Sequence, residues 1–402
     1  VAAVLARVSG LRQLRARGPV EGRIIDRETM LRRVKEHVRK QVPLEAVRGE
    51  SDFLKAFGFL PLNFDYEAGI YALIEKELAG YFDPVSKTMF LMADLAASEA
   101  EVTLAHELVH ALQDQHHDLD QGLRYSAGAS DRQSALHCLA EGDATSVMLD
   151  YTLAPAGGTA LSLPDRVLRL EISAAVAASE ELASFPSILH RSLVAPYIDG
   201  ILLVHALRRR GGWAAVDAVW DAPPQTTEQV LHVDKLDARE PAEALAAPDA
   251  GGFEPGFVEA HRDTYGEQGL RTALEEWMPR RQAESAAAGW AGDRATVLAR
   301  RVGGARDVAA AWHIRFDLAA GPRARGLEAA EAFNLIAQAW RVQPTVGETA
   351  CHTVGDGRVI GLALRGRDLG MVAASIDASD LQRTGQRCAA VTRWAIHVAR
   401  AR

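Results

Sequence analysis

Cysteine is scarce in this chain of 402 residues, which contains only Cys138, Cys351 and Cys388. Three cysteines are too few for a disulfide-stabilised scaffold, and no CxxC pair suggests a structural zinc site. Basic residues are outnumbered, with 45 Lys and Arg against 53 Asp and Glu, which argues against a nucleic-acid-binding surface. No run of about 18 consecutive apolar residues is present, so we expect no transmembrane segment.

The overall composition is that of an ordinary globular protein, with 48% hydrophobic and 24% charged residues. This apolar content excludes wholesale disorder, and the length predicts two or three domains. Residues 1–75 have mostly helical patterns and form the first predicted segment. Residues 76–250 form a mainly helical domain with two short strands, and residues 251–402 form an α+β domain. The predicted fold class of the chain is therefore α+β.

The C-terminal domain is expected to contain two hairpins with a helix between them, at about residues 326–341. Apolar alternation interrupted by turn residues predicts the strands of each hairpin. The strands are residues 297–302 with 308–316, around Gly303-Gly304, and residues 359–364 with 371–376. We find no catalytic motif in this part of the chain.

Two short strands and a long helix are predicted near residue 100. Tyr81-Phe82 and residues 88–92 are aromatic or apolar, and they flank a turn that begins at Asp83-Pro84. Ser98 and Glu101 have the spacing of a capping box, which predicts the start of the helix.

The sequence HELVH at residues 106–110 lies in this predicted helix and has the HExxH pattern. Residues four apart share one face of a helix, so the imidazoles of His106 and His110 can reach the same metal ion. Glu107 lies about 100° around the helix from His106, where its carboxylate can hold a water beside the metal. Two neutral imidazoles and a carboxylate suit Zn²⁺.

A catalytic zinc needs a third protein ligand, and two residues compete for that role. His116 lies six residues after His110, the spacing of the third histidine in metzincins. On an unbroken helix, however, it faces about 240° away from His110. Gln113, a helix former, also stands where metzincins have a glycine that turns the chain. Glu141 lies on the apolar face of the next predicted helix, which begins near Ser130. Because an unpaired buried carboxylate is costly and a metal removes that cost, Glu141 is preferred.

HELVH on one helix with a Glu on the next resembles the gluzincins, the thermolysin-like branch of the zincin metallopeptidases. The runs GYFDP, HELVHALQDQ, AEGDAT, PYIDG and PPQTTEQVLH are similar to a group of uncharacterised bacterial zincin-like proteins, and together they span roughly residues 78–236. The GxMEN motif of the aminopeptidase branch is absent, which speaks against N-terminal trimming. Thr145 stands where the thermolysin NExxSD pattern has its Asp, which leaves Asp143 as a candidate replacement.

By this resemblance, the middle segment is a zincin-like catalytic domain with a short edge-strand sheet, and its substrate is a peptide or protein. The implied activity is endopeptidase, with Zn²⁺ held by His106, His110 and Glu141. The zinc ion would polarise the peptide carbonyl, and Glu107 would take a proton from the attacking water.

The resemblance also implies a substrate edge and an oxyanion donor. The strand at residues 88–92 would be the sheet edge along which an extended peptide pairs. A hydrogen-bond donor should stabilise the oxyanion, and Tyr197 and His232 are the candidates. His137, one turn before Glu141, is expected to pack beside the metal ligand or to support it.

An alternative from another functional class is a zincin-fold binding or scaffolding protein without peptidase activity. The metal would then be structural or lost, and residues 251–402 would carry the function. Glu107 favours the enzyme, because a structural metal site has no need of a general base.

The cellular location is tied to the cysteines. The chain begins with Val1 rather than Met, which suggests a removed leader and favours an exported protein, periplasmic or secreted, over a cytoplasmic one. In an exported protein, Cys351 and Cys388 could form a disulfide between the start of the second C-terminal hairpin and a terminal helix; two unrelated thiols are the alternative. Cys138 is predicted to be a buried thiol.

Overall fold

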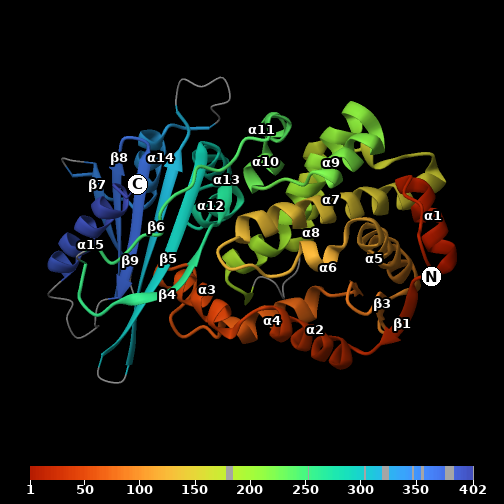
Figure 1. Cartoon of the computed structure of the whole chain (residues 1–402), viewed down its shortest axis with the longest axis horizontal. Helices are drawn as coiled ribbons and strands as arrows, with labels where there is room; N and C mark the ends of the chain where they lie inside the picture. The colour runs from red at the N-terminus through yellow and green to blue at the C-terminus, as the bar shows by residue number, and fades with distance from the viewer. Residues whose placement is uncertain are drawn as a thin grey trace. The chain divides into compact units, whose positions relative to one another are not determined.

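The fold is that of a computed structural model of the chain, which describes residues 1–177, 184–251, 253–302, 305–318, 326–345, 348–354, 357–375 and 384–401. Helices predominate among these residues and two β-sheets are present, so the predicted α+β class is confirmed (Figure 1). The chain divides into two compact units. Unit 1 comprises Val1–Val42, Glu67–Tyr125 and Arg132–Arg239, and unit 2 comprises Pro43–Tyr66, Ser126–Asp131 and Glu240–Arg402. The helical segment predicted at residues 1–75 is thus shared between the two units.

Unit 1 is mainly helical and contains a three-stranded sheet. Its elements are α1 (Ala2–Arg12), β1 (Glu21–Ile25), α2 (Arg27–Gln41), α4 (Tyr66–Glu77), β2 (Gly80–Asp83), β3 (Thr88–Met92), α5 (Ala97–His117), α6 (Leu119–Gly122), α7 (Ser130–Leu153), α8 (Asp165–Ala177), α9 (Ser187–Asp221), α10 (Thr227–Leu231) and α11 (Val233–Ala238), with 3₁₀ turns at Ala154–Ala156 and Ala160–Ser162.

The sheet of unit 1 has the strand order β1-β3-β2. The predicted hairpin is confirmed, because β2 and β3 pair antiparallel around the turn at Asp83-Pro84. β1 pairs in parallel with β3, from Glu21 opposite Thr88 to Ile25 opposite Met92. The prediction that residues 88–92 form the sheet edge is therefore wrong, because β3 is the central strand and β2 lies at the edge.

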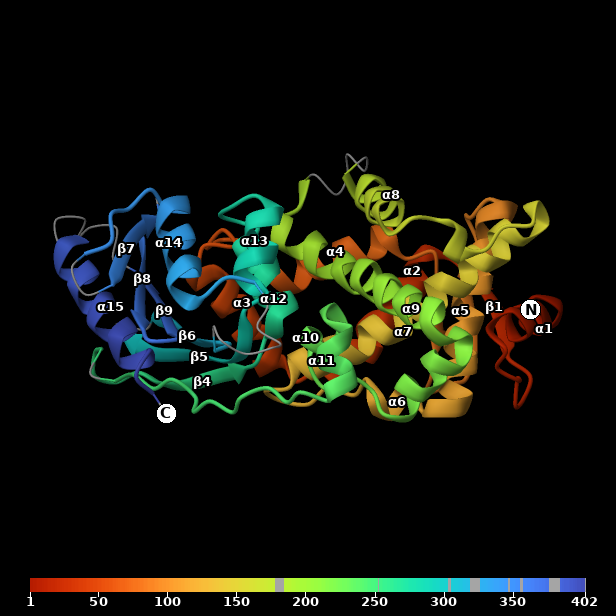
Figure 2. The same ribbon diagram turned by 90° about the horizontal axis from the view of Figure 1, so that it is seen from above.

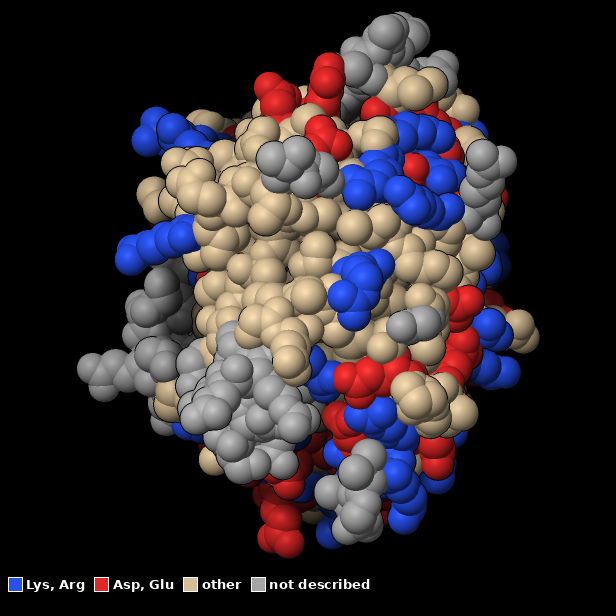
Figure 3. Space-filling view, turned by 90° about the vertical axis from the view of Figure 1, so that its left-hand side faces the viewer, with Lys and Arg blue, Asp and Glu red and all other residues tan. Residues whose placement is uncertain are grey.

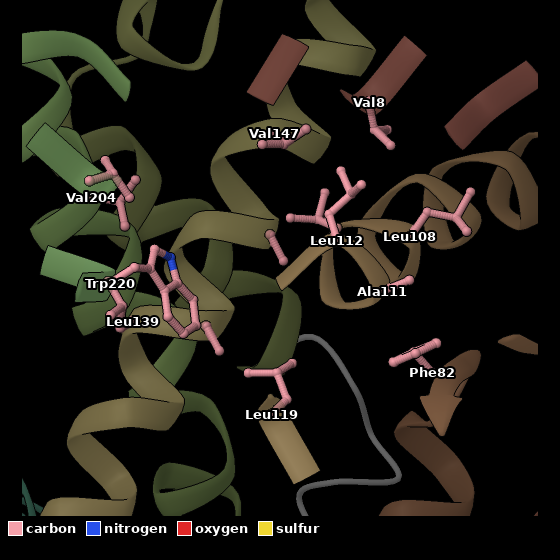
Figure 4. Close-up of a cluster of buried hydrophobic side chains, with 14 of the residues drawn as sticks. Val8, Phe82, Leu108, Ala111, Leu112, Leu119, Leu139, Val147, Val204 and Trp220 are labelled. Atoms are coloured by element: carbon pink, nitrogen blue, oxygen red, sulfur yellow. The ribbon is translucent and has the colours of Figure 1, made fainter. Parts of the chain in front are cut away.

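The core of unit 1 forms where α5 packs against α1, α7 and α9. Leu104, Leu108 and Leu112 recur at helical spacing on α5 and are buried. Figure 4 shows Leu112 beside Val8 of α1 and Val147 of α7, and Ala111 on the side of α5 toward Phe82 of β2. This packing determines which face of α5 remains for His106 and His110.

The N-terminus of α5 differs from the prediction. The helix begins at Ala97, and its N-cap residue, Ala96, makes no side-chain capping hydrogen bond. The predicted capping box of Ser98 and Glu101 is thus wrong, since Ser98 already lies in the first turn. Instead, Oε1 of Glu101 accepts a hydrogen bond from the hydroxyl of Tyr151 on α7.

One helix in the described part of the chain, α9, is long and apolar enough to cross a membrane. However, 56% of its apolar window is buried inside the protein, as in a core helix. Gly211 and Gly212 have non-helical backbone angles and kink α9. Length and composition alone are therefore weak evidence for a membrane span.

Unit 2 is built on a six-stranded antiparallel sheet of order β4-β5-β6-β9-β8-β7 (Figure 2). Its elements are α3 (Leu44–Ala56), β4 (Val258–Asp263), α12 (Gly266–Leu274), α13 (Arg280–Ala287), β5 (Trp290–Val302), β6 (Ala305–Phe316), α14 (Ala329–Ala339), β7 (Thr349–Val354), β8 (Arg358–Arg365), β9 (Asp368–Ser375) and α15 (Thr384–Val398). Both predicted hairpins and the helix between them are present; Gly303-Gly304 and Ile376 lie outside the described residues.

The two faces of this sheet pack against different helices. Val391 and Trp394 of α15 are buried against Ala309 and Ala311 of β6. Side chains alternate along a strand, so Trp312 points to the opposite face, where Phe53 of α3 lies 5.6 Å from its ring. Figure 3 views the side that lies at the left of Figure 1, where a broad uncharged area adjoins groups of both charge signs.

The structure contains the disulfide that the sequence left open as one of two alternatives, and it confirms the buried thiol. Cys351 of β7 and Cys388 of α15 form a disulfide, with Cα atoms 5.8 Å apart. The bond joins the strand that precedes the β8–β9 hairpin to the terminal helix. Cys138 of α7 is a buried free cysteine.

Removing the disulfide should destabilise unit 2. The two cysteines are 37 residues apart, and closing a loop of that size stabilises a fold by about 3–4 kcal/mol through the unfolded state. We expect the double substitution Cys351→Ala/Cys388→Ala to lower the free energy of unfolding by that amount in denaturant titrations. Reductant should have the same effect on the parent and no further effect on the variant; an unchanged midpoint would contradict the expectation.

Candidate metal centre

The candidate centre lies on the face of α5 that is turned away from the core. His106 and His110 are one helical turn apart, and their Nε2 atoms lie 3.2 Å from each other. Their side chains are 12% and 13% exposed, so the imidazoles are largely shielded from solvent but are not completely buried. The HExxH spacing thus places two imidazole nitrogens side by side, as the sequence predicts.

Glu141 reaches the same point from α7. Its Oε2 lies 3.2 Å from Nε2 of His106 and 3.6 Å from Nε2 of His110. Its other oxygen lies 3.1 Å from Nε2 of His137, the residue one turn earlier. The carboxylate is therefore held from one side by His137 and directed at the two imidazoles on the other.

Two glycines let the helices approach closely beside Glu141. A Cβ atom on Gly142 of α7 would overlap the backbone of Gly200 on α9, and one on Gly200 would overlap the carbonyl of Cys138. Neither position accepts a side chain without separating the helices. The EG pair of the AEGDAT run and the glycine of the PYIDG run thus meet, and their contact fixes the position of the Glu141 backbone.

Electrostatic interactions link the side chains of His106, His110 and Glu141. Burial alone would lower the pKa of His110, but the carboxylate of Glu141 outweighs it and raises the pKa to about 9. Burial alone would raise the pKa of Glu141, yet the charge of His110 and hydrogen bonds from His106, His110 and His137 hold it well below its usual range. A buried carboxylate is thus kept ionised by imidazoles, the protonation state in which it can bind a metal.

The donor set fits a zinc ion. The ligand atoms of His106, His110 and Glu141 all lie within 4.8 Å of one another, as the donors of one ion must. Two imidazole nitrogens and one carboxylate oxygen are the three protein ligands that catalytic zinc sites commonly have, with a fourth position open.

Gln113 orients one of the imidazoles, a role that the sequence analysis missed. Nδ1 of His110 lies 2.8 Å from Oε1 of Gln113, and Nε2 of Gln113 donates to the carbonyl of Ala140. This assigns the proton of His110 to Nδ1 and leaves Nε2 for a metal. The signal was present in the sequence, because Gln113 follows His110 by three residues and so lies on the same helix face.

Substituting Gln113 should weaken metal binding without removing a ligand. Outer partners of ligating histidines typically contribute 10–100-fold to affinity, so we expect Gln113→Leu to raise the Kd for Zn²⁺ by about that factor. Competition with a chelating dye measures the change. Gln115→Leu is the matched control, because Gln115 is bonded to Arg17 and Gly18 and should leave the Kd unchanged. Equal affinities in both variants would refute this role.

Glu107 is positioned by the backbone of the edge strand. Its Oε2 accepts a hydrogen bond of 2.8 Å from the amide of Phe82 in β2. The carboxylate is thus fixed beside the imidazoles and is not part of the three-atom cluster. Such a carboxylate can accept and return a proton while the neighbouring residues hold a metal.

A cavity of about 480 Å³ opens beside His106 and Glu107. Its polar lining includes His106, Glu107, Thr145 and Tyr197, and Gly80 contributes backbone from β2. Most of the remaining wall is apolar and is formed by Ile74 of α4, Leu78 just after α4, Val102 of α5, Met148 of α7, Ile172 of α8, and Leu193 and Val194 of α9. The cavity can therefore accept an apolar group next to a small polar centre.

The other predicted residues are found at different places. Tyr197 lines the cavity, with its ring 6.3 Å from that of His106. His232 lies between α10 and α11 and is not among the residues of the cavity wall. His116 faces away, with Nε2 2.8 Å from the carbonyl of Arg15. Asp143 does not take the role of the Asp that the NExxSD pattern has at the position of Thr145. Its two oxygens accept hydrogen bonds from Arg12 and Trp220 instead.

No protein-family model, curated protein or solved structure matches this chain.

Proposed function

We propose that the protein is a zinc-dependent peptidase, most simply an endopeptidase of the gluzincin type. The observation that carries the proposal is the convergence of His106, His110 and Glu141, with Glu107 adjacent but outside the ligand set. When bound, zinc would supply Lewis-acid chemistry at the peptide carbonyl and lower the pKa of a water to about 7.

Side chains of the protein would carry out proton transfer and oxyanion stabilisation. Glu107 accepts the proton of the attacking water and passes it to the leaving amine. This transfer needs a carboxylate in a fixed position, and the hydrogen bond from the Phe82 amide holds Glu107 in place. Tyr197 lines the cavity with its ring beside that of His106, and its hydroxyl is the candidate donor to the oxyanion. His232 does not line the cavity, so we no longer propose it for this role.

The edge strand β2 is the proposed track for the substrate backbone. The carbonyl of Ala79 is bonded to Met92 of β3, whereas the amide of Phe82 points the other way, to Glu107. Because strand residues alternate between the two edges, the amide and carbonyl of Gly80 also point away from β3. An extended peptide that pairs with Gly80 would pass in front of Glu107 and His106.

The lining of the cavity predicts the substrate preference. Aliphatic side chains and Met148 form most of the wall, so a substrate side chain that enters it should be apolar. Peptides with Leu or Phe beside the scissile bond are therefore expected to be cleaved in preference to peptides with Asp or Lys there.

Peptide cleavage by the purified full chain tests the function. We expect hydrolysis of an internally quenched peptide library that is abolished by a zinc chelator and restored by Zn²⁺. The products should be internal fragments rather than single N-terminal residues. Zinc binding without cleavage of any peptide would reject the proposal and favour the binding or scaffolding alternative.

We also propose an exported location, periplasmic or secreted. The support is the Cys351–Cys388 disulfide, since such bonds persist in oxidising compartments and are rare in the cytosol. Protein isolated from its native source without reductant should contain one free thiol per chain, that of Cys138. Three free thiols would contradict the location.

A further inference from the structure

Unit 2 contains a second group of potential metal ligands, remote in sequence from HExxH. Glu50 of α3 and His261 and Asp263 of β4 place one ligand atom each within 4.8 Å of one another. His261 and Asp263 are two residues apart on one strand, so their side chains share a face of the sheet. That face is the one against which α3 packs.

Within the described parts of the chain, His261 has a buried ring nitrogen without a hydrogen-bond partner, which distinguishes this group from an ordinary cluster of ion pairs. Its side chain is only 9% exposed, and among the described residues its Nε2 has no hydrogen-bond partner. The nearest acidic atom is Oδ2 of Asp263, at 3.9 Å, which is too long for a hydrogen bond. It is nevertheless within the roughly 4.4 Å that separates the farthest two donors of one ion with bonds of about 2.0–2.2 Å. A buried imidazole nitrogen therefore has no hydrogen-bond partner in the structure as described, although the Asp263 carboxylate lies close to it.

The backbone around His261 is built to hold this side chain inward. The register of β4 with β5 shifts between Glu259 and His261, a bulge of the kind that redirects side chains. Gly49 of α3 makes room for the ring, because a Cβ atom there would overlap Cβ and Cγ of His261. Gly49 immediately precedes Glu50, so the same close approach brings the Glu50 carboxylate to the imidazole.

The two carboxylates are oriented by neutral hydrogen-bond donors. The hydroxyl of Tyr265 donates to Oε2 of Glu50 at 2.7 Å. Ser130 holds Asp263 with its amide at 3.1 Å and its hydroxyl at 2.6 Å. Neutral donors fix both groups, as they do around metal-bound carboxylates.

No lysine or arginine of the described residues forms an ion pair with either Glu50 or Asp263. The arginines nearest in sequence or on adjoining strands are engaged elsewhere. Arg262 pairs with Glu259, Arg294 donates to Gly128 and Thr264, and Arg306 pairs with Asp52. Buried carboxylates without a cation are costly to ionise, and a divalent ion removes that cost.

We propose that Glu50, His261 and Asp263 form a second site, which binds a divalent first-row transition-metal ion and joins α3 to β4. One imidazole with two carboxylates suits ions such as Zn²⁺ or Mn²⁺ and disfavours Ca²⁺, whose ligands are oxygens. The ligands come from two elements that pack on each other, so the proposed role of the ion is structural.

The test is a calorimetric titration of the metal-stripped full chain with Zn²⁺ alone. We expect two ions per chain in the parent, one in His261→Gln and one in His110→Gln, each variant keeping the affinity of its intact site. Even outer partners of metal ligands are worth about 10–100-fold, so His261→Gln should raise the Kd of the second site at least about tenfold. His397→Gln, at an exposed histidine that pairs with Asp249, is the control and should retain two ions.

Two further variants keep the outcome clear if His261→Gln folds poorly. Glu50→Gln keeps an acceptor for Tyr265 but loses the charge, and Gly49→Ala displaces the His261 ring; both should lose the second ion. Ca²⁺ at equal concentration should not compete. A single ion in the parent that only His110→Gln removes would overturn the second site and leave the proposed peptidase centre intact. Weak binding that survives every variant would mark surface adsorption and would also overturn it.

Discussion

Glu107→Gln is expected to lower the rate of peptide hydrolysis by about 10²–10⁴-fold, the usual contribution of a positioned general base. Gln is nearly isosteric with Glu, and its side-chain oxygen can still accept the hydrogen bond from the Phe82 amide. The substitution therefore removes the proton acceptor without removing a candidate ligand. Steady-state kinetics on a peptide that the parent cleaves, with zinc content measured on the same sample, separates the two effects.

The control for this variant is Glu99→Gln, which changes an exposed residue in the first turn of the same helix. It should retain full activity and full zinc content. Glu107→Gln with parental turnover would remove the proposed role of Glu107, whereas loss of zinc together with activity would make Glu107 a ligand instead.

Arg12→Leu is expected to destabilise unit 1 by about 3–5 kcal/mol, because it leaves a buried carboxylate without its cation. Nε of Arg12 lies 2.6 Å from Oδ1 of Asp143, and neither side chain is exposed. Trp220 donates to the other oxygen of Asp143 at 2.8 Å, and the guanidinium also contacts Asp217. This network joins α1 and α9 to α7, the helix that carries Glu141.

Urea unfolding measures the loss, with Arg39→Leu as the matched control. Arg39 pairs with Glu67 at an exposed site, where an ion pair is worth roughly 0–1 kcal/mol. Replacing both Arg12 and Asp143 by Leu should recover part of the stability, because the unpaired buried charge is gone. Equal effects of Arg12→Leu and Arg39→Leu would show that the buried network contributes nothing.

The metal-centre geometry could be predicted where it depends on local helical periodicity. His106 and His110 share a face because they are four residues apart, and Leu108 and Val109 between them are buried in the core. The choice of Glu141 as the third ligand rests on the free-energy cost of burying an unpaired carboxylate on an apolar helix face. The hydrogen bond between His110 and Gln113 is equally local, since the two residues lie three apart on the same helix.

What could not be predicted depends on contacts between segments far apart in the chain. β1 has an almost wholly exposed burial pattern, without the alternation that marks a strand, and it pairs with β3 more than 60 residues later. Its position makes β2 the sheet edge, which reverses the expectation for residues 88–92. Glu50 and His261 likewise give no local signal, because they meet only when α3 packs on β4.

Anomalous diffraction at the zinc edge, from crystals of the zinc-loaded full chain, is the most direct test of the proposed peptidase centre. We expect a peak bonded to Nε2 of His106, Nε2 of His110 and an oxygen of Glu141, at about 2.0–2.2 Å from each, with Glu107 beside it and uncoordinated. A peak that has His116 in place of Glu141, or no peak at this cluster while zinc occupies other parts of the chain, would contradict the centre and the peptidase mechanism built on it.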